Sequence, residues 1–249
     1  MRADLFGCPI DLLTRAETIA RVREAIHQKK RLHHVALNVA KLVNMRRNPD
    51  LAADVRSSDL IGVDGMGIVL AARMLGLCVG ERFAGIDLMD GVLTLCAEEG
   101  YRPYFLGATR SVVCAAAAAA CKRHPALKFA GIRDGYFEAR EERHVVAEIH
   151  SSHADCLFVG MPTPRKEKFL AAYRDQLGAP FIMGVGGSFD ILAGRVQRAP
   201  LRLQRLGLEW LFRIYQEPRR MWWRYAKTNF IFAWLLLQAI FSRSGHEYQ

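Results

Sequence analysis

Short apolar runs rich in β-branched residues alternate with helix-like segments along most of this 249-residue chain. The alternation extends from about His34 to Asp190 and is typical of a mainly parallel sheet covered by helices. The segments with strand character are residues 34–38, 60–63, 101–106, 127–132, 156–159 and 181–185. Those with helix character are residues 39–47, 67–75, 88–99, 111–123, 140–151 and 165–176. The pattern predicts an α/β fold with one Rossmann-like domain, a mainly parallel sheet flanked by helices.

The character of the sequence changes near Pro200, where strand signals end and helical, Arg- and Trp-rich sequence begins. Between Arg195 and Lys227, nine basic residues stand against two acidic ones, so this segment carries most of the net charge of +10. The following residues, 230–241, are apolar on nearly all sides but fall short of the ~20 residues that cross a bilayer. We therefore expect a Rossmann-like domain over residues 1–200 and a helical, membrane-associated appendage over residues 201–249.

The six cysteines are scattered, without a CxxC pair, and the first residues have no secretory pattern. Neither a zinc site nor a disulfide framework is indicated, and the cysteine usage favours a reducing cytoplasm.

The residues that follow each predicted strand are candidates for a site, because ligands of open α/β sheets collect at the carboxyl ends of the strands. Asp64 ends an apolar strand and precedes Gly65 and a helix, whose N-terminus favours anions. This placement suits a catalytic carboxylate, but a plain helix cap has the same pattern. On the local sequence the two interpretations are about even.

Other strand ends carry glycine-rich or charged turns. Residues 184–190 (GVGGSFD) are similar to a phosphate-binding turn but match neither G-x-G-x-x-G nor a P-loop. Residues 161–167 begin a helix with two prolines and a charge cluster, which fits a solvated first turn as well as contact with a diphosphate. Arg82 and Asp87 fit a surface ion pair or a ligand pocket equally well.

Three arginines of the appendage, Arg213, Arg220 and Arg224, share one face if the helix is continuous past Pro218. The tryptophans around them are favoured at lipid interfaces. A solvated arginine face over a tryptophan core would look similar, but the adjacent apolar residues 230–241 favour the membrane interpretation.

Taken together, the motifs resemble the WecG/TagA/CpsF family, glycosyltransferase family 26. The resemblance runs in order from about Asn38 to Tyr225, and its strength lies in this ordered co-occurrence. It is carried by Asn-x-x-Lys at Asn38, DG-x-G at Asp64, R-x-x-G-x-D at 82–87, FLGAT at 105–109, G-x-x-x-GYF at 131–137, VG…P-x-x-E at 159–167, GVGGSFD-x-x-AG at 184–194, RAP at 198–200 and GLEWLFR…EPRR at 207–220. The last two blocks are the most specific.

The resemblance implies an inverting glycosyltransferase of bacterial exopolysaccharide or cell-envelope polysaccharide synthesis. It would move a hexose, N-acetylhexosamine or uronic-type sugar from a UDP-sugar to an undecaprenyl-diphosphate-linked glycan. The implied position is peripheral, at the cytoplasmic face of the inner membrane, with no metal, no other cofactor and no nucleic acid. Self-association of the chain is left open.

Carried over by position, the resemblance also implies roles for individual residues. Asp64 looks like the general base that takes the proton of the acceptor hydroxyl. The implied donor-binding residues are Asn38, Gly65, Arg82, Gly107, Tyr136, Gly160, Pro164, Lys166, Glu167, Gly186, Gly187 and Asp190. Those implied for the acceptor diphosphate are Arg198, Arg213, Arg220 and Arg224, whose planar guanidinium groups suit phosphate oxygens.

Two positions depart from the family pattern. The family commonly has P-K-Q-E where this chain has P-R-K-E, so Lys166 replaces an amide near the donor pocket. Ala36 stands where threonine is frequent. These departures leave the sugar open: Lys166 fits an acidic sugar or the donor diphosphate, and a neutral sugar such as glucose fits as well.

Other classes of protein compete with this interpretation. A nucleic-acid-binding protein fits the net charge, but the basic residues concentrate beside an apolar segment instead of a groove-reading module. A noncatalytic, nucleotide-binding membrane scaffold or a nucleotide-dependent oxidoreductase fits the fold. Neither accounts for the GLEWLFR…EPRR block.

Overall fold

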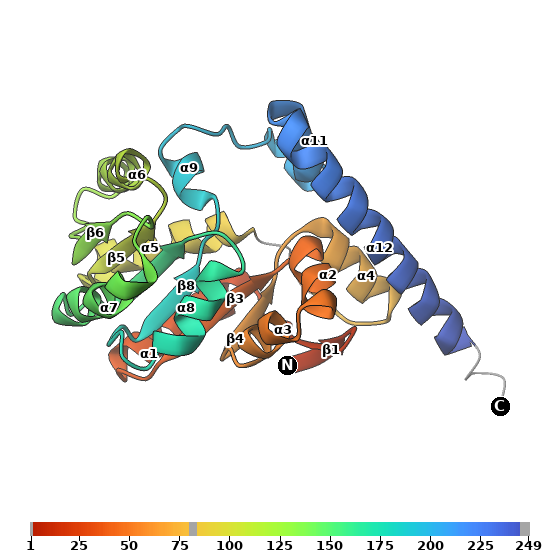
Figure 1. The fold of residues 1–249 in the computed structure, drawn as a ribbon, viewed down its shortest axis with the longest axis horizontal. Helices are drawn as coiled ribbons and strands as arrows, with labels where there is room; N and C mark the ends of the chain where they lie inside the picture. Colours follow the sequence, from red (N-terminus) through yellow and green to blue (C-terminus); the bar gives the residue numbers. More distant parts are fainter. Residues whose placement is uncertain (1, 80–83, 245–249) are drawn as a thin grey trace.

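The computed structural model describes residues 2–79 and 84–244, which form an eight-stranded sheet flanked by helices (Figure 1). The strand order is β1-β2-β4-β3-β8-β7-β5-β6, with β1 and β2 antiparallel and the other neighbours parallel. The strands are β1 (Arg2–Leu5), β2 (Cys8–Asp11), β3 (Leu32–Leu37), β4 (Leu60–Val63), β5 (Pro103–Gly107), β6 (Gly131–Arg133), β7 (Cys156–Gly160) and β8 (Phe181–Gly184). The predicted mainly parallel α/β sheet is confirmed.

Helices connect the strands and cover the sheet (Figure 1). They are α1 (Arg15–His27), α2 (Val39–Arg47), α3 (Pro49–Arg56), α4 (Met66–Met74), α5 (Gly85–Glu99), α6 (Arg110–Arg123), the 3-10 turn η1 (Ala139–Glu141), α7 (Glu142–Ser151), α8 (Arg165–Tyr173), α9 (Ser188–Leu192), α10 (Leu201–Arg205), α11 (Glu209–Gln216) and α12 (Pro218–Ser244).

Three apolar clusters fill the space between sheet and helices. One joins α1, α5, α6 and α9 around Phe105 and Phe158, and another joins α7 and α8 around Ile182. The remaining cluster joins α2, α3 and α4 to the first strands around Ile61 and also takes in Phe232 of α12. Burial of each such side chain contributes about 1.5–3 kcal/mol to folding stability. The clusters therefore stabilise the packing of the helices on the sheet.

The first 27 residues contain a hairpin and a helix that the strand–helix pattern did not indicate. β1 and β2 are only four residues each and join through Phe6 and Gly7, which both have positive φ (56° and 78°). α1 begins with a capping box, in which Thr14 and Glu17 satisfy each other's backbone N–H groups. That Thr-x-x-Glu pattern was a readable sequence signal for α1, whereas strands this short give almost none.

The strand expected at residues 127–132 is shorter than predicted. β6 covers only Gly131–Arg133, and the preceding residues cross from the end of α6 to the sheet edge. Leu127 is buried in this crossing, which explains its strand-like apolar character.

The appendage contains the helices α10, α11 and α12. α11 ends at Gln216 and α12 begins at Pro218, because proline lacks the N–H of a helix interior and disfavours helix at Glu217 (φ −131°, ψ 64°). The condition for Arg213 to share one helix face with Arg220 and Arg224, a helix that continues past Pro218, is therefore not met.

One side of α12 packs against the body of the protein, along α2 (Figure 1). Phe232 is buried and meets Phe6 edge-on, with 5.8 Å between ring centroids. Thr228, one turn earlier, is also buried. Residues 230–241 thus present only part of their surface outward. Across the ranges that the structure describes, no helix is both long and apolar enough to cross a membrane.

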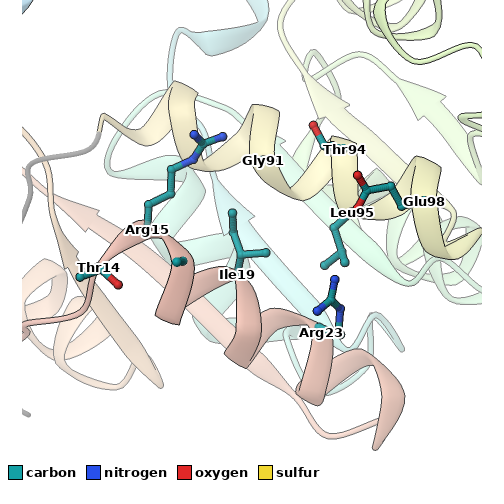
Figure 2. Close-up of a pocket in the computed structure, with 9 residues that line it drawn as sticks. Thr14, Arg15, Ile19, Arg23, Gly91, Thr94, Leu95 and Glu98 are labelled. Atoms are coloured by element: carbon teal, nitrogen blue, oxygen red, sulfur yellow. The ribbon is translucent and has the colours of Figure 1, made fainter.

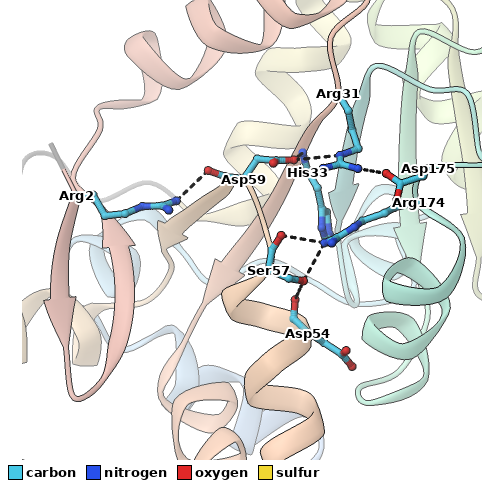
Figure 3. Close-up of polar contacts among 8 residues, drawn as sticks. All are labelled: Arg2, Arg31, His33, Asp54, Ser57, Asp59, Arg174 and Asp175. Carbon is cyan, nitrogen blue, oxygen red and sulfur yellow. Dashed lines mark hydrogen bonds and ion pairs between the residues drawn. The ribbon is translucent and has the colours of Figure 1, made fainter.

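A charged network joins the amino ends of β3 and β4 (Figure 3). It lies at the end of the sheet opposite the carboxyl ends, where we expect the ligands. Arg31 pairs with Asp59 and Asp175, and Asp59 accepts a hydrogen bond from the His33 N–H at 2.8 Å. Arg174 donates to the Ser57 carbonyl and hydroxyl. These partly exposed pairs fix loop positions more than they add stability.

Two adjacent histidines of β3, His33 and His34, are buried beside this network. Burial lowers the pKa of His33 to about 4 and that of His34 to about 3. No ring nitrogen of either residue has a hydrogen-bond partner among the described residues. The folded protein therefore holds both side chains neutral, whereas the unfolded chain protonates them near pH 6.5.

We predict that folding stability is complete above about pH 6.5 and falls as the pH drops toward the folded-state pKa values. At pH 5 the loss reaches up to about 2 kcal/mol for each histidine. Urea unfolding at pH 7 and pH 5 measures this. The His34→Leu variant should lose less stability on acidification than wild type, and exposed His27→Gln should behave as wild type. Equal pH dependence of all three proteins would contradict the assignment.

Candidate active site at the carboxyl ends of the strands

Asp64 directly follows β4, and its backbone N–H donates to the carbonyl of Leu37 at the end of β3 (2.8 Å). Gly65 has φ of 92° and is the N-cap of α4, which has no side-chain cap hydrogen bond. The helix-cap interpretation of Asp64 is therefore not what the structure shows. Its carboxylate lies at the start of α5, since Oδ2 is 3.8 Å from where a Cβ on Gly85 would be.

Side chains of two neighbouring strands, Ala36 of β3 and Met183 of β8, also lie next to Gly85. A Cβ there would lie 3.8 Å from the Ala36 Cβ and 3.9 Å from the Met183 Cε. The carboxylate of Asp64 thus lies where the ends of β3, β4 and β8 converge on the N-terminus of α5. A helix N-terminus at such an edge is suited to anionic substrate groups.

The loop after β3 contributes Asn38, whose side chain caps α2 by accepting from the Lys41 N–H at 3.0 Å. Lys41 then reaches Glu167 of α8, with 3.1 Å from Nζ to Oε1. Lys166 approaches the same oxygen at 3.3 Å, and the Thr163 hydroxyl donates to it at 3.2 Å. The predicted donor residues Asn38, Lys166 and Glu167 are therefore close together.

Lys41 is a member of this cluster that sequence reasoning did not single out. Its spacing was the available signal, because Asn-x-x-Lys places the lysine one helical turn after the strand end. Burial alone would raise the pKa of the Glu167 carboxyl, but the two lysines outweigh burial and lower it to about 2. Burial and Lys41 lower the pKa of Lys166 to about 8.

Two of the predicted donor-site glycines are required by backbone packing. Gly107 has φ of 140°, and a Cβ there would lie 2.5 Å from the Gly160 carbonyl. A Cβ on Gly160 would lie 2.4 Å from the ring of Phe189 in α9. These contacts explain both glycines without a ligand, and they bring β5, β7 and α9 together.

The turn after β8 is different. Gly186 has φ of 52°, and a Cβ there would meet nothing within 4 Å. Gly187 is the N-cap of α9, and the Asp190 carboxylate is 3.9 Å from its Cβ position. The backbone of Gly186 is therefore open to close approach by a ligand.

Tyr136 lies in the loop after β6, and Pro164 lies in the loop after β7. Tyr136 is exposed, whereas Phe137 beside it is buried. Pro164 follows a cis peptide bond and begins α8. Arg165 stacks on the Phe137 ring, 4.6 Å from its centroid, and donates to the Phe137 carbonyl, so its guanidinium is engaged within the protein.

Arg198, three residues before α10, forms a bidentate ion pair with Asp87 of α5. The Nη1–Oδ1 and Nη2–Oδ2 distances are both 2.7 Å, and Nε is 3.9 Å from Glu209 of α11. Burial would raise the pKa of the Asp87 carboxyl, but Arg198 reverses this and lowers it. The ion pair or ligand pocket expected for Arg82 with Asp87 stays a prediction, because Arg82 lies outside the described residues, and the partner observed for Asp87 is Arg198.

The appendage also contacts the loop that carries Asp64. A Cβ on Gly207, in the turn between α10 and α11, would lie 2.5 Å from Met66 at the start of α4. Arg213 in α11 is exposed. Arg82 and the side chains of Arg220 and Arg224 lie outside the described residues, so their predicted contacts stay predictions.

A groove of about 470 Å³ lies between α1 and α5 (Figure 2). It contains none of the predicted site residues. Gly91 of α5 faces Arg15 and Ile19 of α1, and a Cβ there would lie 2.7 Å from Ile19. The groove reflects close packing of two helices. Among residues 2–79 and 84–244, no group of three His, Cys, Asp or Glu side chains is arranged to hold a metal ion.

Comparison with known proteins identifies the relatives of this fold. The model of the Glycosyl transferase WecG/TagA/CpsF family matches residues 3–246. The chain belongs to the WecG/TagA/CpsF family of glycosyl transferases. An N-acetylglucosaminyldiphosphoundecaprenol N-acetyl-β-D-mannosaminyltransferase from Bacillus spizizenii is 34% identical over 178 residues, covering 72% of this chain and 68% of that protein. The resemblance seen in the sequence is thus confirmed at the level of the family.

The Asp87–Arg198 pair joins two motifs of the WecG/TagA/CpsF family, R-x-x-G-x-D and RAP. We predict a coupling energy on the order of 1 kcal/mol in a double-mutant cycle of Asp87→Ala and Arg198→Ala, because the pair is bidentate and about two-thirds buried. Thermal or urea unfolding measures it.

The exposed pair Arg140–Glu138 provides the matched control, because its side chains are largely solvated. Its cycle should give a coupling energy near zero. If the Asp87–Arg198 cycle gave the same value as this control, the pair would not hold the segment before α10 to α5.

Proposed function

We propose that this protein is an inverting glycosyltransferase that uses a UDP-sugar and acts on a sugar carried by undecaprenyl diphosphate. Family membership supports the reaction class, and the Bacillus spizizenii relative is named as a transferase of N-acetylmannosamine to N-acetylglucosaminyl-diphosphoundecaprenol. A sugar of the hexose, N-acetylhexosamine or uronic type fits this class. The observation that carries the proposal is the Asp64 carboxylate at the meeting point of three strand ends and a helix N-terminus.

In this reaction Asp64 is the general base. It takes the proton of the acceptor hydroxyl while that oxygen forms a bond to C1 of the donor sugar. The bond between C1 and the UDP oxygen breaks on the opposite side, so a single displacement inverts the configuration and releases UDP. The electron pair of the broken bond leaves with the diphosphate, which the open Gly186 turn and helix N-termini are suited to receive.

The remaining predicted roles divide between the two substrates. The Gly186–Gly187 turn with Asp190 and the residues after β3 and β7 would hold the donor. Arg198, Arg213 and the arginines of early α12 would bind the diphosphate of the acceptor lipid. The position of Gly207 against Met66 supports this division, because it brings the appendage next to the loop of Asp64.

The outward side of α12 supports docking on a membrane surface. Five large apolar side chains at helical spacing, between 48% and 76% exposed, form what we call the α12 stripe: Trp223, Phe230, Trp234, Leu237 and Phe241. The buried Phe232 lies away from them on the packed side. An apolar stripe beside a basic segment is the arrangement of interfacial helices on anionic lipid. We place the protein at the cytoplasmic face of the inner membrane.

The chemistry predicts a specific kinetic effect of Asp64→Asn. Transfer should fall by about 10²–10⁴-fold, as is typical when a general base is lost, while UDP affinity stays within a few-fold. Transfer assays and calorimetric titration with UDP separate the two effects. Near-normal turnover of the variant would remove Asp64 from catalysis.

The membrane proposal predicts that Phe230→Ser with Trp234→Ser weakens sedimentation with anionic liposomes at least tenfold, since each buried aromatic contributes about 1.5–3 kcal/mol. Phe232 is left intact, so the packing against Phe6 is preserved. Tyr136→Ser removes an equally exposed ring from the domain of residues 1–200, far from the α12 stripe in the sequence. This variant should sediment as wild type. Unchanged sedimentation of the double variant would contradict docking through the α12 stripe.

A further inference from the structure

Side-chain amides of the appendage hold the backbone on both sides of Arg198. Gln216 of α11 forms two hydrogen bonds with the backbone of Gln197: it accepts from the N–H at 3.1 Å and donates to the carbonyl at 3.0 Å. Gln204 of α10 donates to the carbonyl of Ala199, which is buried. The Arg198 side chain therefore starts from a defined position.

Asp87 fixes the other end of this side chain, the guanidinium group. Each of its carboxylate oxygens lies 2.7 Å from one terminal nitrogen of Arg198. The carboxylate is itself oriented, because Oδ2 also accepts a hydrogen bond from the Ala84 N–H before α5, at 3.3 Å. A flexible arginine loses conformational entropy when it binds a ligand, so a guanidinium that is already fixed binds more tightly.

The ion pair leaves part of the guanidinium available. A guanidinium has five N–H groups, and Asp87 faces one on each terminal nitrogen, which leaves the second N–H of each. Nε is buried and has no hydrogen-bond partner among the described residues, and Glu209 Oε1 is 3.9 Å away from it. The Arg198 side chain stays 32% exposed. The group can thus pair with Asp87 and still donate to a second anion.

The charge of this part of the chain favours such an anion even with Asp87 present. Residues 195–213 contain five arginines and one acidic residue, Glu209, which gives a net charge of +4. The carboxylate of Asp87 reduces this to +3. Positive charge therefore remains in excess, and it attracts anionic groups of a substrate.

The Asp87–Arg198 pair lies beside the proposed base. Asp87 is in the first turn of α5, and Gly85, where that helix begins, faces the Asp64 carboxylate. The turn proposed for the donor diphosphate lies elsewhere, because the Gly186 carbonyl oxygen is 3.4 Å from the Cβ position of the last residue of β7. In the sheet, β3 and β8 separate β7 from β4, which precedes Asp64.

We propose that Asp87 is a positioning residue for the acceptor: it fixes the Arg198 guanidinium so that the outer N–H groups bind the phosphate next to the acceptor sugar. In the proposed acceptor, the sugar whose hydroxyl reaches Asp64 carries the diphosphate on its anomeric carbon. One sugar ring therefore separates the base from the first phosphate. A guanidinium beside the base is placed to meet it, and paired N–H donors suit phosphate oxygens. This inference rests on the proposed lipid-diphosphate acceptor.

Steady-state kinetics of the full-length protein separate the acceptor from the donor. The substrates are a UDP-sugar that supports transfer and an N-acetylglucosamine linked through diphosphate to a short farnesyl chain. Asp87→Asn keeps the shape of the side chain and removes its charge. It should raise the KM for this acceptor about tenfold or more, while the KM for the UDP-sugar and the Kd of UDP change less than threefold. Loss of a negative charge alone would strengthen phosphate binding, so this direction identifies positioning.

Asp90→Asn is the matched control, because Asp90 lies three residues later on α5 and pairs with Arg123 of α6. This variant should behave as wild type. Asp87 acts through Arg198 in this proposal, so Asp87→Asn combined with Arg198→Met should raise the acceptor KM no further than Arg198→Met alone.

Thermal unfolding verifies that each variant is folded. If Asp87→Asn does not fold, Asp87→Glu replaces it, since it keeps the charge and shifts the guanidinium by one methylene; the acceptor KM should again rise more than the donor KM. An acceptor KM within threefold of wild type, or an equal or larger rise of the donor KM, would overturn the positioning role. A wild type that binds UDP but transfers no sugar to any lipid-linked acceptor would instead overturn the proposed function, and this inference with it.

Discussion

Parallel pairing of β3 with β4 and with β8 is the constraint on which the site depends. Parallel strands end at the same edge, so the residues after β4, β3 and β8 meet although they are far apart in the chain. The register places Leu37 opposite Val63, and the next residue, Asp64, bonds to the Leu37 carbonyl. A shift of one residue would move Asp64 away from the start of α5 and separate the proposed base from the donor edge.

The appendage packs next to the carboxyl ends of the strands, because Gly207 approaches Met66 at the start of α4. It contacts the core in three places: Glu209 lies 3.9 Å from Arg198, which pairs with Asp87; Gly207 approaches Met66; and Phe232 is buried against Phe6. Each lies on a different element, so together they fix the direction of α12. The α12 stripe then points outward, while the turn at Gly207 lies against Met66 near Asp64. This geometry would let one helix rest on lipid and leave the acceptor diphosphate within reach of Asp64.

Sequence patterns predicted the parts of the fold that have long, periodic signals. Helices α2 and α6 and strands β4 and β7 lie within a residue of the segments expected for them. The β1–β2 hairpin was missed because four-residue strands are too short to show a period, and its turn relies on a left-handed Phe6. Lys166 and Glu167 are consecutive in one family motif. The motif could not reveal that Lys41 joins them, because that contact depends on how α2 and α8 pack.

In the appendage, too, the sequence predicted the helices but not their contacts. Composition indicated an amphipathic, basic end of the chain, and the helices are there. Which side of α12 is buried could not be read from a segment that is apolar on nearly all sides. Packing against Phe6 and α2 decides it, and these residues lie far earlier in the chain. Likewise, the sequence did not reveal that the Arg198 guanidinium, which we propose contacts the acceptor diphosphate, also pairs with Asp87.

The central claim is that the chain transfers one sugar from UDP to a lipid-diphosphate-linked acceptor. The most direct test incubates the full-length protein with a panel of UDP-sugars and an undecaprenyl-diphosphate-linked N-acetylglucosamine, and measures the mass of the lipid product. The account predicts that the acceptor gains the mass of one sugar residue and that an equal amount of UDP is released. An acceptor of unchanged mass with every UDP-sugar, from a protein that nevertheless binds UDP, would contradict it.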